Sequence, residues 1–224
     1  AAVVMQPHLV TFGSASRKER EKVMLIPLQQ GDTALSAFNT GVFTERLRKA
    51  GIKEINIEGA AVVGDHLILA NRGNNTYREN HLIITEKDYW ARQHEAAISV
   101  LPLTLPTDAK GFLGVSELCY VPSSNSLLLT LSSEATANAY DDGAIGDSYI
   151  AWIENIGQKL GQPGVATDGM INLGEADARF KGEKIEGICI EQANGNELLL
   201  HLVADNDKGQ SRLFHVKMVM DAFH

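Results

Sequence analysis

The amino-acid sequence predicts an all-β fold, a β-propeller built from four-stranded blades, and two observations lead to this prediction. A short apolar strand, a tight turn and a second apolar strand with a polar end recur near residues 57–72, 115–134 and 185–207. No helical period recurs between the copies, which argues against an alternating β/α fold. Repeated units of short strands are typical of propellers, in which radial repetition leaves only short sheet edges. A β-sandwich is the rival fold.

The repeat divides the chain into four blade units, near residues 1–54, 55–112, 113–183 and 184–224. Each of the last three units carries a glutamate near the start of its first strand; these motif glutamates are Glu58, Glu117 and Glu186. In the first unit, Ala-Ala-Val-Val at residues 1–4 matches residues 60–63, so the corresponding glutamate would lie just before Ala1. We therefore expect an N-terminal part of the protein, with further blades, to precede this chain.

Further strands complete the units. Apolar stretches bounded by turn residues predict third strands at residues 22–28, 81–85, 148–153 and 212–218, and a fourth strand at residues 97–103. The third unit differs by its long connection, residues 133–147, between its second and third strands.

One helix is predicted, at residues 40–49. Val42, Phe43 and Leu47 have helical spacing, and Gly51 stands where a helix C-terminal cap is expected.

Composition excludes several classes of function. The 224 residues are 44% hydrophobic and 21% charged, as in soluble globular proteins. A net charge of −8 argues against nucleic acid as the main partner. No apolar run approaches the roughly 18 residues that a membrane span requires. No glycine-rich phosphate loop is present, so we expect no organic cofactor. The compartment stays open between cytoplasm and periplasm. Cys119 and Cys189 are predicted to be free, buried thiols.

Propeller topology predicts where a site would lie. The first strand of a blade starts on one face of the disc and the second strand returns to that face. The motif glutamates therefore share a mouth with the polar residues that end the second strands, and Arg17 joins them from the first unit. The predicted ligand-binding mouth comprises Arg17, Glu58, Asn71, Arg72, Glu117, Glu134, Glu186, Asp205 and Asp207.

Several carboxylates near one axis repel one another and must be neutralised. In one interpretation Glu58, Glu117 and Glu186 are structural and accept hydrogen bonds from neighbouring blades. In another they hold Ca²⁺ or another divalent cation, since such ions prefer oxygen ligands. In a third, paired carboxylates act as general acid and base. The acidic loop at residues 140–147 would cover this mouth, whereas His201, inside a strand, is predicted to be packed.

Three segments also carry a resemblance to a known family. Residues 55–62 with 70–75, residues 9–16, and residues 184–187 with 203–207 resemble an uncharacterised bacterial family of propeller proteins. More distantly, the chain is similar to the phytase-like and esterase-like propellers, which are six-bladed. Its Glu-Gly pairs resemble those of gluconolactonase propellers, where such a glutamate binds a divalent cation. In this chain Ala60 and Ile188 replace the proline that follows Glu-Gly there.

Two functions follow as hypotheses. In the first, the protein binds a small ligand, with a divalent cation, at the carboxylate-lined mouth; the distant resemblance implies hydrolysis of a phosphoester, ester or lactone. In the alternative, the propeller is a non-catalytic scaffold that recognises a protein or a small ligand. The sequence identifies neither the ligand nor the partner.

Overall fold

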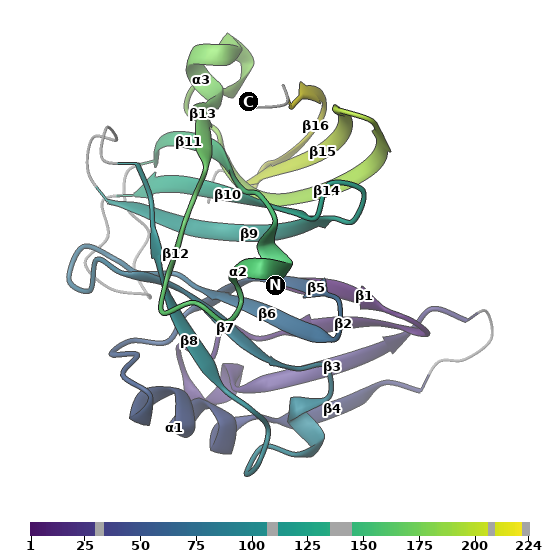
Figure 1. Ribbon diagram of the computed structural model, residues 1–224, viewed down its shortest axis with the longest axis vertical. Helices are drawn as coiled ribbons and strands as arrows, with labels where there is room; N and C mark the ends of the chain where they lie inside the picture. The colour runs from purple at the N-terminus through teal and green to yellow at the C-terminus, as the bar shows by residue number, and fades with distance from the viewer. Residues whose placement is uncertain (30–33, 107–111, 135–144, 206–208, 221–224) are drawn as a thin grey trace.

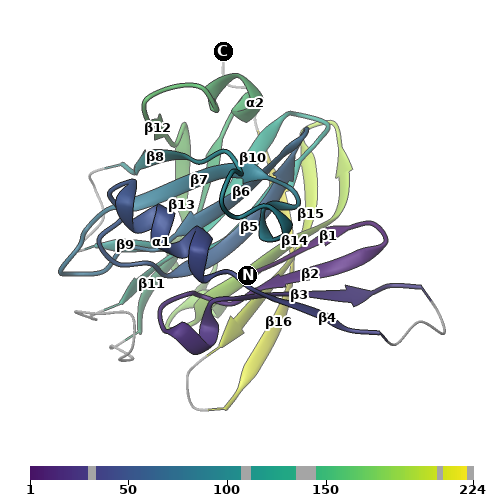
Figure 2. The same cartoon turned by 90° about the horizontal axis from the view of Figure 1, so that it is seen from below.

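The computed structural model describes residues 1–29, 34–106, 112–134, 145–205 and 209–220, and it confirms the predicted fold class. Four small antiparallel sheets follow one another as the blades of a β-propeller (Figure 1). The first strands of the blades lie innermost: β5 lies beside β1 and β9, and β9 lies beside β14. Ala1 lies near the middle of the molecule in two perpendicular views (Figure 1 and Figure 2).

The four blades are defined by their strands. Blade 1 contains β1 (Ala2–Met5), β2 (His8–Phe12), β3 (Lys22–Pro27) and β4 (Ser36–Asn39). Blade 2 contains β5 (Ile57–Val63), β6 (His66–Asn71), β7 (Asn80–Glu86) and β8 (Ser99–Thr104). Blade 3 contains β9 (Leu113–Val121), β10 (Ser126–Glu134), β11 (Ile145–Ile153) and β13 (Gly169–Asn172). Blade 4 contains β14 (Lys184–Asn194), β15 (Glu197–Asp205) and β16 (Ser211–Val219).

Two features depart from a simple four-stranded repeat. The short strand β12 (Val165–Ala166), which follows β11 in the chain, pairs in parallel with β8 and adds a fifth strand to blade 2. Blade 4 has three strands among the described residues. Short helical segments connect the strands: α2 (Ile156–Lys159), α3 (Leu173–Ala176), η1 (Lys18–Arg20), η2 (Tyr89–Ala91) and η3 (Ala178–Phe180).

The predicted helix is present as α1 (Gly41–Lys49). It buries Phe43 and Leu47 against blades 1 and 2, and the chain leaves it at Gly51, whose φ of 110° suits glycine. Val42 shares the predicted spacing but is 38% exposed, because adjacent helical residues are about 100° apart and Val42 lies beside the buried face that Phe43 and Leu47 share. No helix among the described residues is long and apolar enough to cross a membrane.

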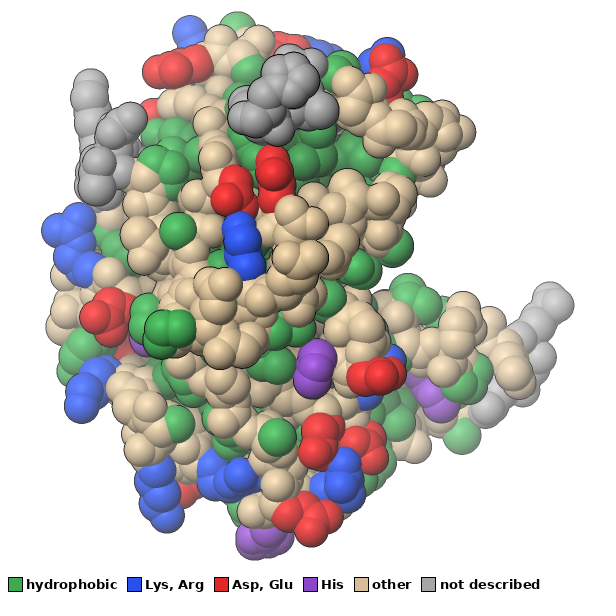
Figure 3. Space-filling view, viewed as in Figure 1, with side chains coloured by type: hydrophobic (Ala, Val, Ile, Leu, Met, Phe, Trp, Pro, Cys, Tyr) green, Lys and Arg blue, Asp and Glu red, His purple; other side chains and the backbone are tan. Residues whose placement is uncertain are grey.

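Three apolar cores hold consecutive blades together. One joins blades 1 and 2 and includes the aromatic rings of Phe12, Tyr89 and Trp90. The second joins blades 2 and 3, and the third joins blades 3 and 4. Among the described residues no comparable core joins blade 4 to blade 1, and the molecular surface is indented between them (Figure 3). Val203 and Leu213 of blade 4 are 43% and 60% exposed.

A β-bulge recurs in the inner strands of blades 2, 3 and 4. The register between first and second strands shifts around Glu58 in blade 2, around Ser116 in blade 3 and around Glu186 in blade 4. A bulge inserts one residue without a partner and redirects its side chain. Each motif glutamate is therefore the bulged residue or its immediate neighbour.

Candidate functional site

The motif glutamates lie at or beside the bulges of three neighbouring inner strands. Glu58 lies second in β5, Glu117 fifth in β9 and Glu186 third in β14. Besides burial, the charge of Glu186 contributes to the raised pKa of Glu58, and the charge of Glu58 contributes to the raised pKa of Glu117. The structure thus brings three of the predicted site residues into one electrostatic cluster.

Glu117 is tied to the backbone of two strands. Its Oε1 accepts hydrogen bonds from the N–H of Leu118, its own neighbour, and from the N–H of Ala60 on β5, both at 2.9 Å. Burial raises the pKa of the Glu117 carboxyl to about 7, although these two hydrogen bonds oppose the shift. The side chain therefore links blade 3 to blade 2 and carries a proton that exchanges near neutral pH.

Glu58 and Glu186 have different surroundings. Burial raises the pKa of Glu58 above its ordinary value, and the Arg72 guanidinium opposes this rise. Glu186 is more open, with 40% of its side chain exposed, and its Oε1 lies 3.0 Å from Nζ of Lys184, which is buried. The three carboxylates thus differ in solvation although they share one repeat position.

Arg72 crosses from blade 2 to blade 3. Its guanidinium donates to Oγ of Ser116 at 2.9 Å and to Oγ of Ser132 at 3.1 Å, and to the carbonyl oxygens of Gly114 and Val115 at 3.4 Å. A Cβ atom on Gly114 would lie 2.5 Å from Nε of Arg72, so only glycine leaves room for this side chain.

Asn71 supports the chain that leads into blade 2. Its Oδ1 accepts from the N–H of Asn56 at 2.8 Å, its Nδ2 donates to the carbonyl of Glu54 at 3.2 Å, and the residue is 1% exposed. Its amide is thus used to hold the connection between α1 and β5 against the end of β6.

A pocket of about 370 Å³ opens at this end of blade 2. Its walls are residues 51–54, which follow α1, and residues 71–81, which connect β6 to β7. Its charged lining residues are Lys53, Glu54, Arg72, Arg78 and Glu79. His81 closes one side, and burial lowers the pKa of its imidazole. Because Ile57 pairs with Asn71, the pocket lies at the end of blade 2 where Glu58 stands.

The other predicted mouth residues take separate positions. Arg17 is exposed in the connection between β2 and β3. Asp205 ends β15 directly opposite Lys184, close to the bulge at Glu186. Glu134 ends β10, and its side chain lies outside the described part of the structure, as do Asp207 and residues 140–144 of the predicted acidic cover.

In the structure, three further residues lie close together that were not predicted to do so from the sequence. Glu191, His201 and His215 lie on one side of blade 4, with potential ligand atoms within 4.8 Å of one another. Among the described residues this is the one group of at least three His, Cys, Asp or Glu side chains so closely spaced; the motif glutamates do not form another. His201 and Cys189, predicted to be packed and buried, face outward instead, and Cys189 is a free, exposed thiol.

Strand alternation is the signal that would have found His201. Leu198, Leu200 and Leu202 are buried, so the odd-numbered residues of β15 must face outward. The position of Glu191 on this side of the blade was not predictable from strand alternation, because a bulge places it there.

Comparison with known proteins places this arrangement in a family but not in a functional class. No curated protein matches the chain. A sequence profile matches residues 1–209, which cover blades 1 to 3 and β14 and β15 of blade 4, and its description is a family of unknown function, DUF6910. The match covers most of the chain and all three motif glutamates, so this four-bladed protein belongs to the DUF6910 family.

Proposed function

We propose that the protein binds a small anionic ligand in the pocket at the Asn71 end of blade 2, beside the motif glutamates. One observation carries the proposal: Arg72 lines the pocket and also lies beside Glu58. A ligand in the pocket would therefore be coupled to the carboxylate cluster through one guanidinium. Polar pockets with a few charged groups are typical of sites that fix a ligand's orientation.

The charges that line the pocket favour an anionic ligand. Three cationic side chains, from Lys53, Arg72 and Arg78, outnumber two acidic ones, from Glu54 and Glu79. An arginine fork matches phosphate or carboxylate oxygens, so a phosphoester, or an ester that also carries a free carboxylate, is the chemistry that we propose. If the distant resemblance to phytase-like and esterase-like propellers that the sequence suggests holds, it would imply the same substrates.

Acid–base hydrolysis is the reaction that we propose for this site. A carboxyl with a pKa of about 7, as burial gives Glu117, can take up or release a proton at neutral pH, which suits a general acid or base. The carboxyl of the neighbouring Glu58 would be the second member of the acid–base pair. This function requires the bound ester to reach across Arg72 toward the inner strands.

The cation prediction at Glu58, Glu117 and Glu186 is part of the same proposal. Carboxylate oxygens suit Ca²⁺, but Glu117 is engaged by two backbone N–H groups and Glu186 by Lys184. The three side chains are thus not a preformed set of ligands, and the proposed acid–base step does not depend on a metal.

The non-catalytic scaffold is favoured by a different observation. If the motif glutamates serve only to join blades, their internal partners, Ala60 N–H for Glu117 and Lys184 for Glu186, account for them without any ligand. The two functions therefore make different predictions for Lys53 and Arg78, which are exposed residues of the pocket: only ligand binding there requires them.

Binding and turnover of p-nitrophenyl phosphate and of mono-p-nitrophenyl succinate, an ester with a free carboxylate, separate these functions. We expect Lys53→Ala and Arg78→Ala to weaken binding by roughly tenfold each, as loss of a charged hydrogen bond would. Lys87→Ala, outside the pocket, is the control. Calcium titration of the wild type and of Glu186→Gln tests the cation. Absence of binding and turnover for both esters, with or without calcium, would refute the proposal and leave the scaffold.

A further inference from the structure

The side of blade 4 that faces away from blade 3 carries a second cluster of chemically active residues. Alternate residues of β15, from Leu198 to Ala204, are buried against blade 3, and this leaves His201 on the opposite side of the sheet. On β16, Phe214 and Val216 pack against blade 3. His215 lies between them in the strand and therefore faces outward as well. We call this side the outer face of blade 4.

Strand register brings the two imidazoles together. His201 on β15 pairs directly with His215 on β16, and their rings meet edge to face with centroids 4.3 Å apart. Directly paired residues on one face of a sheet have neighbouring Cβ atoms, so this contact is fixed by the backbone and not by a flexible loop.

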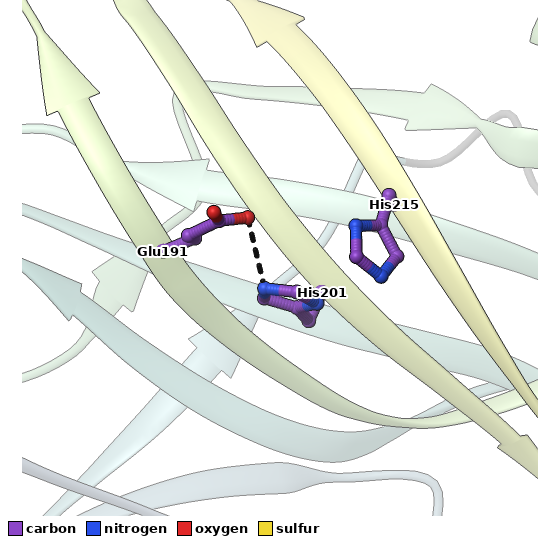
Figure 4. Close-up of side chains that lie close together, drawn as sticks. All are labelled: Glu191, His201 and His215. Atoms are coloured by element: carbon purple, nitrogen blue, oxygen red, sulfur yellow. Dashed lines mark ion pairs between the residues drawn. The ribbon is translucent and has the colours of Figure 1, made fainter.

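A bulge adds the third group. Ile190 pairs with Leu200 and Gln192 pairs with Leu199, which leaves Glu191 between them without a partner. The Glu191 carboxylate turns over the outer face, where its Oε2 lies 3.0 Å from Nε2 of His201 (Figure 4). The ligand atoms of Glu191, His201 and His215 all lie within 4.8 Å of one another. Three neighbouring strands thus each supply one potential ligand.

We propose that Glu191, His201 and His215 form a zinc-binding site on the outer face of blade 4. Two imidazole nitrogens and one carboxylate oxygen are a common zinc ligand set, whereas Ca²⁺ and Mg²⁺ prefer oxygen ligands. Zinc bonds of about 2.0–2.2 Å in tetrahedral geometry place ligand atoms about 3.3 Å apart. The glutamate–histidine pair, at 3.0 Å, is close to this spacing, and the ligand atom of His215 lies within 4.8 Å of both.

The site is open to solvent. The Glu191 side chain is 54% exposed and that of His201 is 25% exposed, so a water or an external group can take the fourth position of the metal. Because the ligands come from β14, β15 and β16, a bound ion would also tie together every strand of this blade. Zinc should then raise the thermal stability of the protein as well as bind to it.

Zinc binding to the untagged full chain tests the proposal, with zinc alone as the probe. We expect one Zn²⁺ per chain in equilibrium dialysis, unaffected by excess Ca²⁺, and a rise in the unfolding midpoint on zinc addition. His201→Ala, His215→Ala and the nearly isosteric Glu191→Gln should each weaken zinc binding by at least tenfold and remove the rise. The matched control is His66→Ala, since His66 is likewise an exposed strand histidine.

Folding of each variant is checked by its circular dichroism and by its unfolding midpoint in the absence of zinc. The proposal is overturned if the wild type binds no zinc, or if folded variants of the three ligands bind zinc as tightly as the His66 control. Glu58→Gln and Glu186→Gln should leave zinc binding unchanged; loss of zinc binding in those variants would place the metal at the motif glutamates instead.

Discussion

Glu117 combines a structural and a chemical property that its surroundings make compatible. Its Oε1 joins β9 to β5 by accepting the Ala60 N–H, and burial raises the pKa of the carboxyl to about 7. A protonated carboxyl keeps an acceptor oxygen, so the link between the blades survives protonation. Ionisation in these partly buried surroundings, close to Glu58, is what costs free energy.

Stability should therefore depend on pH through Glu117. Its pKa rises from an ordinary 4.5 to about 7 on folding, so the folded chain holds the proton more tightly than the unfolded chain. The resulting stabilisation is complete below pH 4.5 and is lost as the pH rises through 7. Glu117→Gln keeps the acceptor without the charge, and we expect it to gain on the order of 1–3 kcal/mol at pH 8 relative to the wild type, with a flatter pH profile.

Urea unfolding at several pH values between 4.5 and 8 measures this difference, and Glu95→Gln, at an exposed position, serves as the control. A Glu117→Gln protein whose stability follows the wild-type pH dependence would show that this carboxyl is already ionised at neutral pH in the fold.

At the scale of elements, the bulge and the glycine after it set how closely neighbouring blades approach. A Cβ atom on Gly59 would lie 2.9 Å from the backbone nitrogen of Leu118 and 2.9 Å from its Cγ. Gly187 holds the equivalent place in blade 4, but a Cβ there would meet only Val203, at 3.4 Å or more. The same Glu-Gly pair is thus tightly packed in one blade and loosely packed in another.

This difference predicts a large effect on stability for one of two matched substitutions and a small effect for the other. Gly59→Ala should push β5 away from β9, break the Ala60–Glu117 hydrogen bond and destabilise the protein by about 2–3 kcal/mol, as overpacking does. Gly187→Ala should change stability by less than about 1 kcal/mol. Chemical denaturation of both variants is the measurement, and equal effects would mean that the two blade junctions are packed alike.

The sequence was sufficient for the first three strands of each blade and for β8, and insufficient for β4, β12, β13 and the bulges. Apolar stretches bounded by turn residues predict β6, β7 and β15. A bulge adds one residue to one strand and leaves the apolar pattern almost unchanged. The repeat therefore predicted Glu58 and Glu186 near the starts of their strands, but neither the bulges there nor the meeting of Glu191 with His201 was predictable.

For the whole molecule, the sequence predicted four blade units but not what joins them. The pairing of β12 with β8 involves two residues from each strand, too few to leave a pattern. Besides the apolar cores, single polar side chains link neighbouring blades. Oδ1 of Asn80 accepts the N–H groups of Gly73 and Val115 at 3.1 Å, and its Nδ2 donates to the carbonyl of Leu113 at 2.8 Å.

A serine makes the corresponding link between blades 3 and 4. Oγ of Ser148 accepts the N–H of Ile185 at 3.1 Å and donates to the carbonyl of Glu183 at 2.8 Å. Asn80 and Ser148 both lie on the third strand of their blade and are buried. Each therefore fixes the start of the next inner strand, just before its motif glutamate.

Removing these links should loosen one junction at a time. Asn80→Ala leaves three buried backbone groups without a partner, each worth about 1–3 kcal/mol, so we expect a large loss of stability and faster amide exchange at Val115. Ser148→Ala leaves two such groups, of which one is the N–H of Ile185, and should speed exchange there instead.

Hydrogen exchange resolved by residue is the measurement. Because the two junctions belong to different blades, each variant serves as the control for the other. Faster exchange at both amides in either variant would show that the four blades open as one unit and not junction by junction.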